Sequence, residues 1–203
     1  MVPEPGWLGE LLRSFERPDV AVVGGTVYVE PVGVWGKAFA LMWFFPLRAE
    51  KPALEPHAIF FASNVAFRRD VFERFPFPDA PGTARHACVL LAQRLREHGI
   101  AVYRNEAAQV SHPAPAGVRR ALERALAQGR DRAVLARDSR RGEGLVPPSF
   151  GRDVVRSLFV GRGRVGLSVA ELPVAAAIAG LYYAVALGSA LATRTGPERR
   201  FRL

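Results

Sequence analysis

The sequence is poor in cysteine and lysine, with Cys88 as its single cysteine and Lys37 and Lys51 as its only lysines. One cysteine excludes a scaffold held together by disulfides and any zinc site built from several cysteines. A glycine-rich phosphate loop is also lacking, because neither Gly24-Gly25 nor Gly161-Arg162-Gly163 has the spacing of a nucleotide-binding fingerprint. No basic-then-apolar stretch opens the sequence, so we expect the chain on the intracellular side of a membrane.

The composition is that of a folded protein. With 203 residues, 49% of them hydrophobic and 23% charged, the chain does not belong to the disordered or low-complexity classes. Its length fits one ordinary domain, or most of one domain followed by an anchor, and is sufficient to bury a core.

The formal net charge of +9 is concentrated in one segment. Residues 1–112 carry 12 basic and 12 acidic side chains, whereas residues 113–165 carry 12 arginines against 5 acidic side chains. A basic block of this kind binds RNA or lies on anionic lipid headgroups. Residues 119–141 have no aromatic side chains among the arginines, which disfavours RNA, so we expect no nucleic-acid partner.

The most apolar part of the chain follows the basic segment. Residues 172–192 include no charged side chain, and as a helix they would be about 31 Å long, close to the thickness of a bilayer's hydrocarbon core. This pattern predicts a single C-terminal transmembrane span, with the catalytic part of the chain on the cytoplasmic side; a buried, alanine-rich core helix is the alternative. Arginines flank both ends, so the sequence does not give the orientation of the span.

Strands alternate with helices before this segment, which predicts an α/β fold with a mixed or parallel sheet. Gly24-Gly25 is expected to form a turn between two strands. Residues 35–47 are apolar and aromatic but contain a lysine and a proline, and are interpreted either as a piece touching the membrane interface or as a helix packed on the sheet. Residues 142–151, rich in Gly and Pro, are expected to be a linker. The expected helices are Trp7–Phe15, Arg68–Phe75, Ala87–His98 and Val118–Asp138, and the expected strands are Val20–Val23, Thr26–Val29, Ile59–Ala62, Ala101–Tyr103 and Ala108–Val110.

Four segments, in this order along the chain, are similar to segments of family 2 glycosyltransferases. Val2-Pro3-Glu4-Pro5-Gly6-Trp7-Leu8 resembles the segment just after the family's Asp-x-Asp motif, and Val20-Ala21-Val22-Val23-Gly24-Gly25 resembles the strand and turn that follow it. Ser63-Asn64-Val65-Ala66-Phe67-Arg68-Arg69-Asp70-Val71-Phe72 resembles the family's asparagine and Ala-Phe-Arg-Arg segment, the most specific of the four. The last is Arg94-Leu95-Arg96-Glu97-His98-Gly99, followed by a strand and Ser111-His112-Pro113.

The resemblance implies a fold and a reaction. Members of the family have the GT-A fold, a Rossmann-like sheet with the nucleotide-sugar site in its N-terminal half, and transfer a sugar from a nucleotide diphosphate to an acceptor hydroxyl. The fold class implied for this chain is a partial GT-A mixed sheet with flanking helices, plus a C-terminal transmembrane helix. In the family a divalent metal, Mg²⁺ or Mn²⁺, is held by the Asp-x-Asp carboxylates and neutralises the departing diphosphate.

The sequence departs from the family's pattern in two places. It contains no Asp-x-Asp, so we expect the donor half and its metal-binding carboxylates to lie outside this chain. Aligned on Arg94, the family's Glu-Asp pair, whose aspartate is the general base, is replaced by Ala87 and Cys88. His86 is a neighbouring side chain able to act as a base at neutral pH, or else a surface histidine with no catalytic role. Cys88 is expected to be a small packing residue at a helix start.

Further candidates follow from position within the matched segments. Asn64, at the end of a strand, is expected to bind substrate or to cap the following turn, and Arg68 is assigned to substrate binding. His112 matches a position that helps to bind the metal in some relatives. Where processive relatives carry Gln-x-x-Arg-Trp, this sequence lacks the tryptophan, which disfavours a processive polymerase; the residues at that place are Gln128, Arg130 and Arg132.

We therefore expect the acceptor-side half of a membrane-anchored glycosyltransferase. The chain would be either a truncated gene product or a protein whose start site is assigned too far downstream. Its division would be residues 1–115 as half of the catalytic domain, 116–165 as a basic helix and linker, and 166–203 as an anchor with a basic tail. The intact enzyme would use a nucleotide sugar and transfer the sugar, with inversion, to a lipid-linked or polysaccharide acceptor, whereas this chain alone would have little or no activity. The alternatives are a non-catalytic subunit that docks on a separate donor-half polypeptide, a degenerate remnant, and a basic RNA-binding protein.

Overall fold

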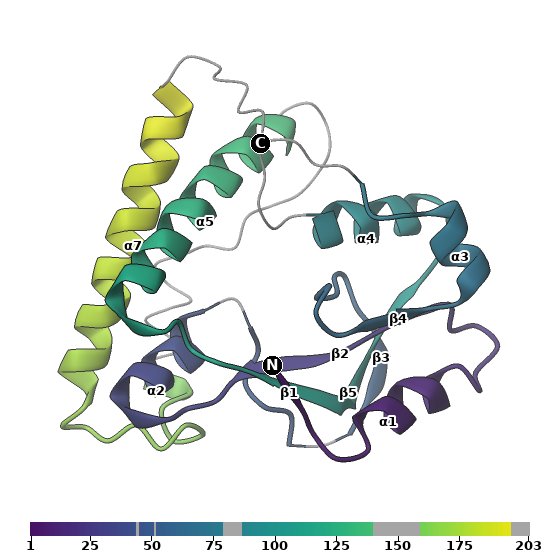
Figure 1. Ribbon diagram of the computed structural model, residues 1–203, viewed down its shortest axis with the longest axis horizontal. Helices are drawn as coiled ribbons and strands as arrows, with labels where there is room; N and C mark the ends of the chain where they lie inside the picture. The colour runs from purple at the N-terminus through teal and green to yellow at the C-terminus, as the bar shows by residue number, and fades with distance from the viewer. Residues whose placement is uncertain (44, 51, 79–86, 140–158, 196–203) are drawn as a thin grey trace. The chain divides into compact units, whose positions relative to one another are not determined.

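The computed structural model of the chain describes residues 1–203 except 44, 51, 79–86, 140–158 and 196–203, and these residues form two compact units (Figure 1). Unit 1 comprises the described residues within Met1–Glu30, Phe44–Asp79 and Ala87–Pro113. Unit 2 comprises the described residues within Pro31–Trp43 and Ala114–Leu203. The predicted first domain, residues 1–115, thus has residues 31–43 in the other unit, and the predicted linker 142–151 lies outside the described residues.

Unit 1 is built on a mixed five-stranded sheet, which confirms the predicted α/β class. The central strand β5 (Val102–His112) runs parallel to β2 (Val22–Val29), and β4 (Val65–Phe67) lies antiparallel to β2 on its other side. The far edge of β5 is shared by two short antiparallel strands, β3 (Leu54–Pro56) and β1 (Val2–Pro3). All eight residues of β2 are buried, as expected of a strand paired on both sides.

The expected turn at Gly24-Gly25 is wrong, because both glycines lie inside the continuous strand β2. A Cβ atom on Gly25 would lie 2.1 Å from the carbonyl oxygen of Ala108 and 2.3 Å from Nδ2 of Asn64. Gly24 is similarly confined, since its Cβ would lie 2.9 Å from the Cβ of Phe60. Glycine is required here for close approach of neighbouring chain segments, not for a turn.

The two short strands expected at 101–103 and 108–110 are likewise one strand, β5, interrupted by a bulge. Gly25 faces Asn105 and Thr26 faces Gln109, so residues 106–108 bulge out of the ladder. The bulge is held by Asn105, whose Oδ1 accepts from the Ala107 amide and whose Nδ2 donates to the Glu10 carbonyl and the Ser14 hydroxyl, each at 2.9 Å.

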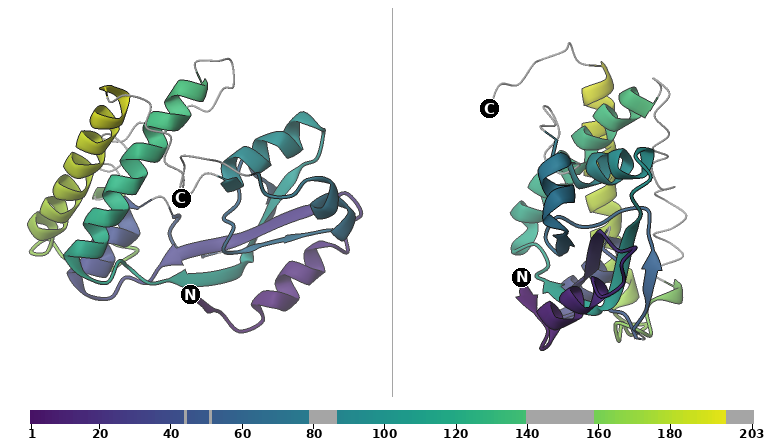
Figure 2. Two further views of the ribbon diagram at one scale, coloured as in Figure 1. Left: turned by 45° about the horizontal axis from the view of Figure 1, so that its top comes forward. Right: turned by 90° about the vertical axis from the view of Figure 1, so that its right-hand side faces the viewer.

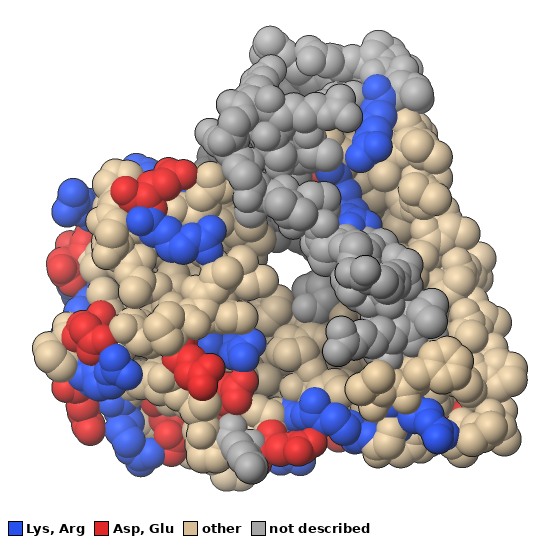
Figure 3. Space-filling model, turned by 180° about the vertical axis from the view of Figure 1, so that it is seen from behind, with Lys and Arg blue, Asp and Glu red and all other residues tan. Residues whose placement is uncertain are grey.

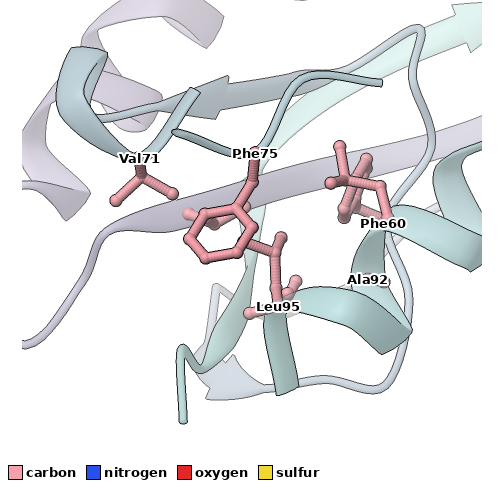
Figure 4. Close-up of a cluster of buried hydrophobic side chains, with 8 residues drawn as sticks. Phe60, Val71, Phe75, Ala92 and Leu95 are labelled. Atoms are coloured by element: carbon pink, nitrogen blue, oxygen red, sulfur yellow. The ribbon is translucent and has the colours of Figure 1, made fainter. Parts of the chain in front are cut away.

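The strand expected at Ile59–Ala62 is also wrong, and pairing begins instead at Val65. The apolar run at Ile59–Ala62 predicted a buried strand, but Phe60 is buried in a side-chain cluster and is not paired in the sheet. The cluster packs β2 and β5 against α3 (Arg69–Arg74) and α4 (Ala87–Glu97), and Figure 4 shows its side chains converging between these elements. The buried residues of the cluster are Val22, Phe60, Val71, Phe75, Leu91, Ala92, Leu95 and Val102.

The helices of unit 1 follow the sequence closely. α1 (Trp7–Ser14), α3 and α4 confirm the predicted helices at these places, and Gly99 after α4 has the positive φ of +73° expected of a helix-ending glycine. Cys88 lies in the first turn of α4 and packs against the apolar cluster. Burial raises the pKa of its thiol, so its predicted role as a packing residue is confirmed and it is not an activated thiolate.

Unit 2 contains three helices among its described residues, α2 (Gly33–Met42), α5 (Gly117–Ser139) and α7 (Leu172–Thr195). α5 confirms the predicted basic helix, and α7 is the one described helix that is long and apolar enough to cross a membrane, with a mean hydropathy of 1.8. Residues 35–42 of the ambiguous aromatic segment belong to α2, which packs against α7 through Phe39 and the following Trp43.

The start of α7 is fixed by a capping box. The Ser168 amide donates to Oε2 of Glu171 at 2.8 Å, and the Glu171 amide donates to Oγ of Ser168 at 3.3 Å. Lys37 of α2 adds an ion pair to the same carboxylate at 3.0 Å. Together these bonds lower the pKa of Glu171 to about 2, the amide of Ser168 having the largest effect.

Acid is therefore expected to loosen the junction between α2 and α7. Because the folded-state pKa of Glu171 is depressed, its stabilisation is complete above the unfolded value of 4.5 and is lost as the pH falls toward 2. Hydrogen exchange of residues 168–176, followed from pH 6 to pH 2.5, is expected to accelerate beyond the intrinsic pH effect in the natural chain. Glu171→Gln should remove this extra pH dependence, and Lys37→Met should keep part of it because the Ser168 bonds remain. An identical pH profile in Glu171→Gln and the natural chain would contradict the assignment.

Candidate functional site

Asn64, the predicted substrate ligand of the most specific matched segment, lies inside unit 1 and is 1% exposed. Its Oδ1 accepts a hydrogen bond from Nε1 of Trp7 at 2.7 Å. Its Nδ2 donates to the carbonyl oxygens of Thr26 at 3.1 Å and Ala108 at 2.9 Å. The structure gives Asn64 the role of joining α1, β2 and the bulge of β5, and contact with a substrate stays a prediction.

Arg68 is also engaged by the chain itself. Its Nε donates to the Val20 carbonyl and its Nη2 to the Phe15 carbonyl, both at 2.9 Å, and its guanidinium lies over the Phe15 ring. Phe15 follows the last residue of α1, and Val20 lies just before β2. These bonds therefore hold the end of α1 next to the segment that leads into β2. Its predicted role in substrate binding is untested.

Polar side chains collect where the parallel strands β2 and β5 end. Tyr28, near the end of β2, donates its hydroxyl proton to Oε1 of Glu4 at 2.8 Å, and Arg48 donates to Oε2 of the same carboxylate at 3.0 Å. Burial and the Glu4 hydrogen bond raise the pKa of Tyr28, so its hydroxyl stays protonated and remains a donor. Ligands of open α/β sheets bind beyond the carboxyl ends of the parallel strands, so this edge is the candidate site.

His112, the predicted metal ligand, is the last residue of β5 at the same edge. Its ring packs against Phe45, with centroids 5.1 Å apart, and its Nδ1 lies 2.7 Å from the Pro113 carbonyl oxygen. Within the described ranges no group of three or more His, Cys, Asp or Glu side chains is placed to hold a metal ion. The described residues therefore do not fit a metal site by themselves, and we derive no step through a metal bound to them.

The remaining catalytic candidate, His86, lies outside the described residues. Arg94, in the fourth matched segment, stacks on the Phe75 ring at 5.5 Å from its centroid. Sequence reasoning missed Glu4, Tyr28 and Arg48 as a group. No local signal could have joined them, because 24 and 44 residues separate Glu4 from its two partners.

Unit 2 has a polar cluster of its own. Nε1 of Trp43 donates to the hydroxyl of Tyr182 at 3.2 Å, and that hydroxyl donates to Oε1 of Gln128 at 2.6 Å. Arg124 lies over the Trp43 ring, 5.1 Å from its centroid. Three residues stand at the place of the processive motif. Gln128 bonds α5 to α7, and Arg130 is exposed. Arg132 is partly buried, and this burial lowers its pKa to about 10.

Comparison with known proteins adds no assignment. No family model matches the chain, and no curated protein or solved structure matches it either.

Proposed function

We propose that this chain is the acceptor-side part of a membrane-associated family 2 glycosyltransferase with a GT-A fold. In the reaction an acceptor hydroxyl attacks the anomeric carbon of a nucleotide sugar, the bond to the diphosphate breaks with inversion, and a base takes the hydroxyl proton. The donor-binding part, with the Asp-x-Asp carboxylates and their Mg²⁺ or Mn²⁺, would come from another polypeptide segment. The acceptor would be a lipid-linked or polysaccharide hydroxyl.

The observation that carries this proposal is that the four matched segments meet at one residue, Asn64. The side chain of Asn64, in the third segment, bonds to Trp7 of the first segment and to Ala108 in the strand inside the fourth. Its carbonyl oxygen accepts from the amide of Gly25, the last residue of the second segment, at 3.0 Å. Four unrelated chance matches would have no reason to meet at one residue, so their meeting supports a common origin for the set.

The proposal assigns roles to two further places. The edge with Glu4, Tyr28 and Arg48 would face the acceptor, since a fixed carboxylate and an exposed guanidinium suit sugar hydroxyls and an anionic lipid phosphate respectively. His86 would be the base in place of the family's aspartate. α7, long and apolar enough to cross a bilayer, would attach the chain to the membrane in which a lipid-linked acceptor lies.

The test supplies the donor part and measures transfer. Sequencing the DNA on both sides of the coding region is expected to find a segment encoding an apolar strand followed by Asp-x-Asp. That segment, fused to this chain or expressed beside it, is assayed in membranes with Mn²⁺ and radiolabelled UDP- and GDP-sugars for label in lipid-extractable or polysaccharide product. His86→Ala is expected to lower the transfer rate by about 100-fold or more, the usual effect of removing a general base.

The controls separate the outcomes. Changing both aspartates of the supplied Asp-x-Asp to alanine should abolish transfer, and Gly9→Ala, at a helix position where the added Cβ meets no atom within 4 Å, should leave it unchanged. Transfer at the same rate without this chain would overturn the proposal. A folded assembly that transfers no sugar from any of these donors would favour the non-catalytic subunit or the remnant. An unchanged rate in His86→Ala would remove the base assignment alone.

A further inference from the structure

α7 is apolar around its whole circumference, and among the described residues protein covers one of its sides. The covered stripe repeats every three or four residues and consists of Ala175, Ala179, Tyr182, Ala186 and Ala190. The opposite face has Val174, Leu181, Leu187 and Leu191, each at least half exposed, and no charged side chain. Figure 3 shows this side of the molecule, at the right, as a long surface almost free of charged atoms.

The covered side of α7 belongs to a close helix pair. α5 lies beside α7 and runs in the same direction (Figures 1 and 2). A Cβ on Gly129 would lie 2.1 Å from the carbonyl oxygen of Ala186, so the two backbones touch at this point. The hydroxyl of Ser189 donates to the Leu126 carbonyl at 2.8 Å across the same seam. The α5 side of the seam is a row of small buried residues, Ala121, Ala125, Gly129 and Ala133.

α5 differs from α7 in being strongly charged. Gln128 and Gly129 contact Tyr182 and Ala186 near the middle of α7, and the next residue along α5 is the exposed Arg130. If α7 crossed a bilayer with α5 beside it, the charge of Arg130 would lie near the centre of the hydrocarbon, where it costs about 3 kcal/mol. Further charged residues of α5 are Arg119, Arg120, Glu123 and Arg124. The packed pair therefore does not fit a crossing.

The packed pair of α5 and α7 has one apolar face and one charged face, each supplied by a different helix. α7 supplies the apolar face and α5 the charged one, and an amphipathic element of this kind lies in the membrane plane. The segment before α7 has the matching composition, with exposed Phe159, Val160 and Val169 beside Arg162 and Arg164, and Arg194 lies near the other end of α7. Arginines at both ends complement the negative charge of anionic lipid headgroups.

We propose that α5 and α7 act as one unit that lies flat on an anionic bilayer surface, with the exposed face of α7 in the acyl-chain boundary and α5 toward water. This placement differs from the transmembrane span expected from the sequence, for which α7 is long and apolar enough. It does not depend on the proposed transferase activity, because it rests on unit 2 alone.

The test is a depth measurement along one line of α7. In a Cys88→Ala background, single cysteines at Ala177, Ala184 and Leu191, all on the exposed face, are spin-labelled in the full chain bound to phosphatidylcholine vesicles with 30% phosphatidylglycerol. Collision with oxygen and with a water-soluble nickel complex gives the depth of each label. A flat α7 places all three labels at the same depth, about 5–10 Å below the headgroups. A label at the exposed Arg130 of α5 is the control and should stay accessible to nickel.

Three results would overturn the proposal. In a crossing helix the Ala184 label would lie near the bilayer midplane, with the other two about 10 Å shallower because seven residues separate each from it. Labels shielded from nickel without vesicles, together with a doubled mass in solution, would show that a second copy covers the face. Equal binding to vesicles of phosphatidylcholine alone would show that the arginines do not select anionic lipid.

Discussion

Asn64→Ala is expected to destabilise unit 1 by about 4 kcal/mol, because each buried polar group left without its hydrogen bond costs about 1–3 kcal/mol. The change removes three hydrogen bonds, so Nε1 of Trp7 and the carbonyl oxygens of Thr26 and Ala108 each lose the Asn64 partner. Urea unfolding of the full chain, read through hydrogen exchange of β2 and β5, measures the loss. Exchange in α5 and α7 should change far less, since those helices belong to unit 2.

The matched control for this prediction is Ser63→Ala. Ser63 is the exposed neighbour of Asn64, and a surface change of this size stays within about 0.5 kcal/mol. If Asn64 served only to bind substrate, Asn64→Ala would be as stable as Ser63→Ala. That equality would contradict the structural role of the asparagine.

Gly129→Ala is expected to destabilise the α5–α7 seam by about 3 kcal/mol, the upper range for forcing an extra methyl group into a packed core. The new Cβ would meet the backbone oxygen of Ala186 at 2.1 Å and the Cβ of Ser189 at 2.8 Å, and a backbone atom cannot turn aside as a side chain can. Hydrogen exchange of residues 121–133 and 175–190 should accelerate in this variant. Binding to anionic vesicles should weaken with it, because separated helices no longer form one amphipathic unit.

Gly188→Ala is the control for the seam. Gly188 lies on the exposed side of α7, where an added Cβ meets no atom within 4 Å, and replacing an interior helix glycine by alanine stabilises a helix by about 1 kcal/mol. Opposite effects of the same chemical change at two glycines would show that contact, not helix propensity, decides the outcome. Equal effects would mean that the seam at Gly129 is not closely packed.

Periodicity was sufficient to predict most helices of this protein. The apolar stripes of α1 and α4, the uncharged run of α7 and the helix-ending Gly99 are local features, and local features are visible in a sequence. The strands were less predictable. β1 and β3 have only two and three residues, and β2 is continuous only because Gly24 and Gly25 admit Phe60 and Asn64 from elsewhere in the chain.

The candidate site also has a part that the sequence predicted and a part that depends on the fold. Asn64 was selected because its segment resembles a family, and the structure shows why an asparagine suits that position: it needs two donors and one acceptor at once. The grouping of Tyr28 and Arg48 on the Glu4 carboxylate depends on a fold that brings distant segments to one strand edge. The pairing of α5 with α7 was equally hidden, since its signal is a row of small residues within a helix that the charge pattern marks as a surface helix.

The assignment of residues 31–43 to unit 2 has a consequence for synthesis on the ribosome. Phe39 and Trp43 are buried in the finished unit, but the tyrosine that Trp43 bonds lies 139 residues further along the chain. At the usual elongation rate of about 5–20 residues per second, on the order of ten seconds pass before that residue is made. During this interval the nascent chain exposes an aromatic segment whose final neighbours do not yet exist. The aromatic segment that α2 begins is therefore buried only once α7 has been made.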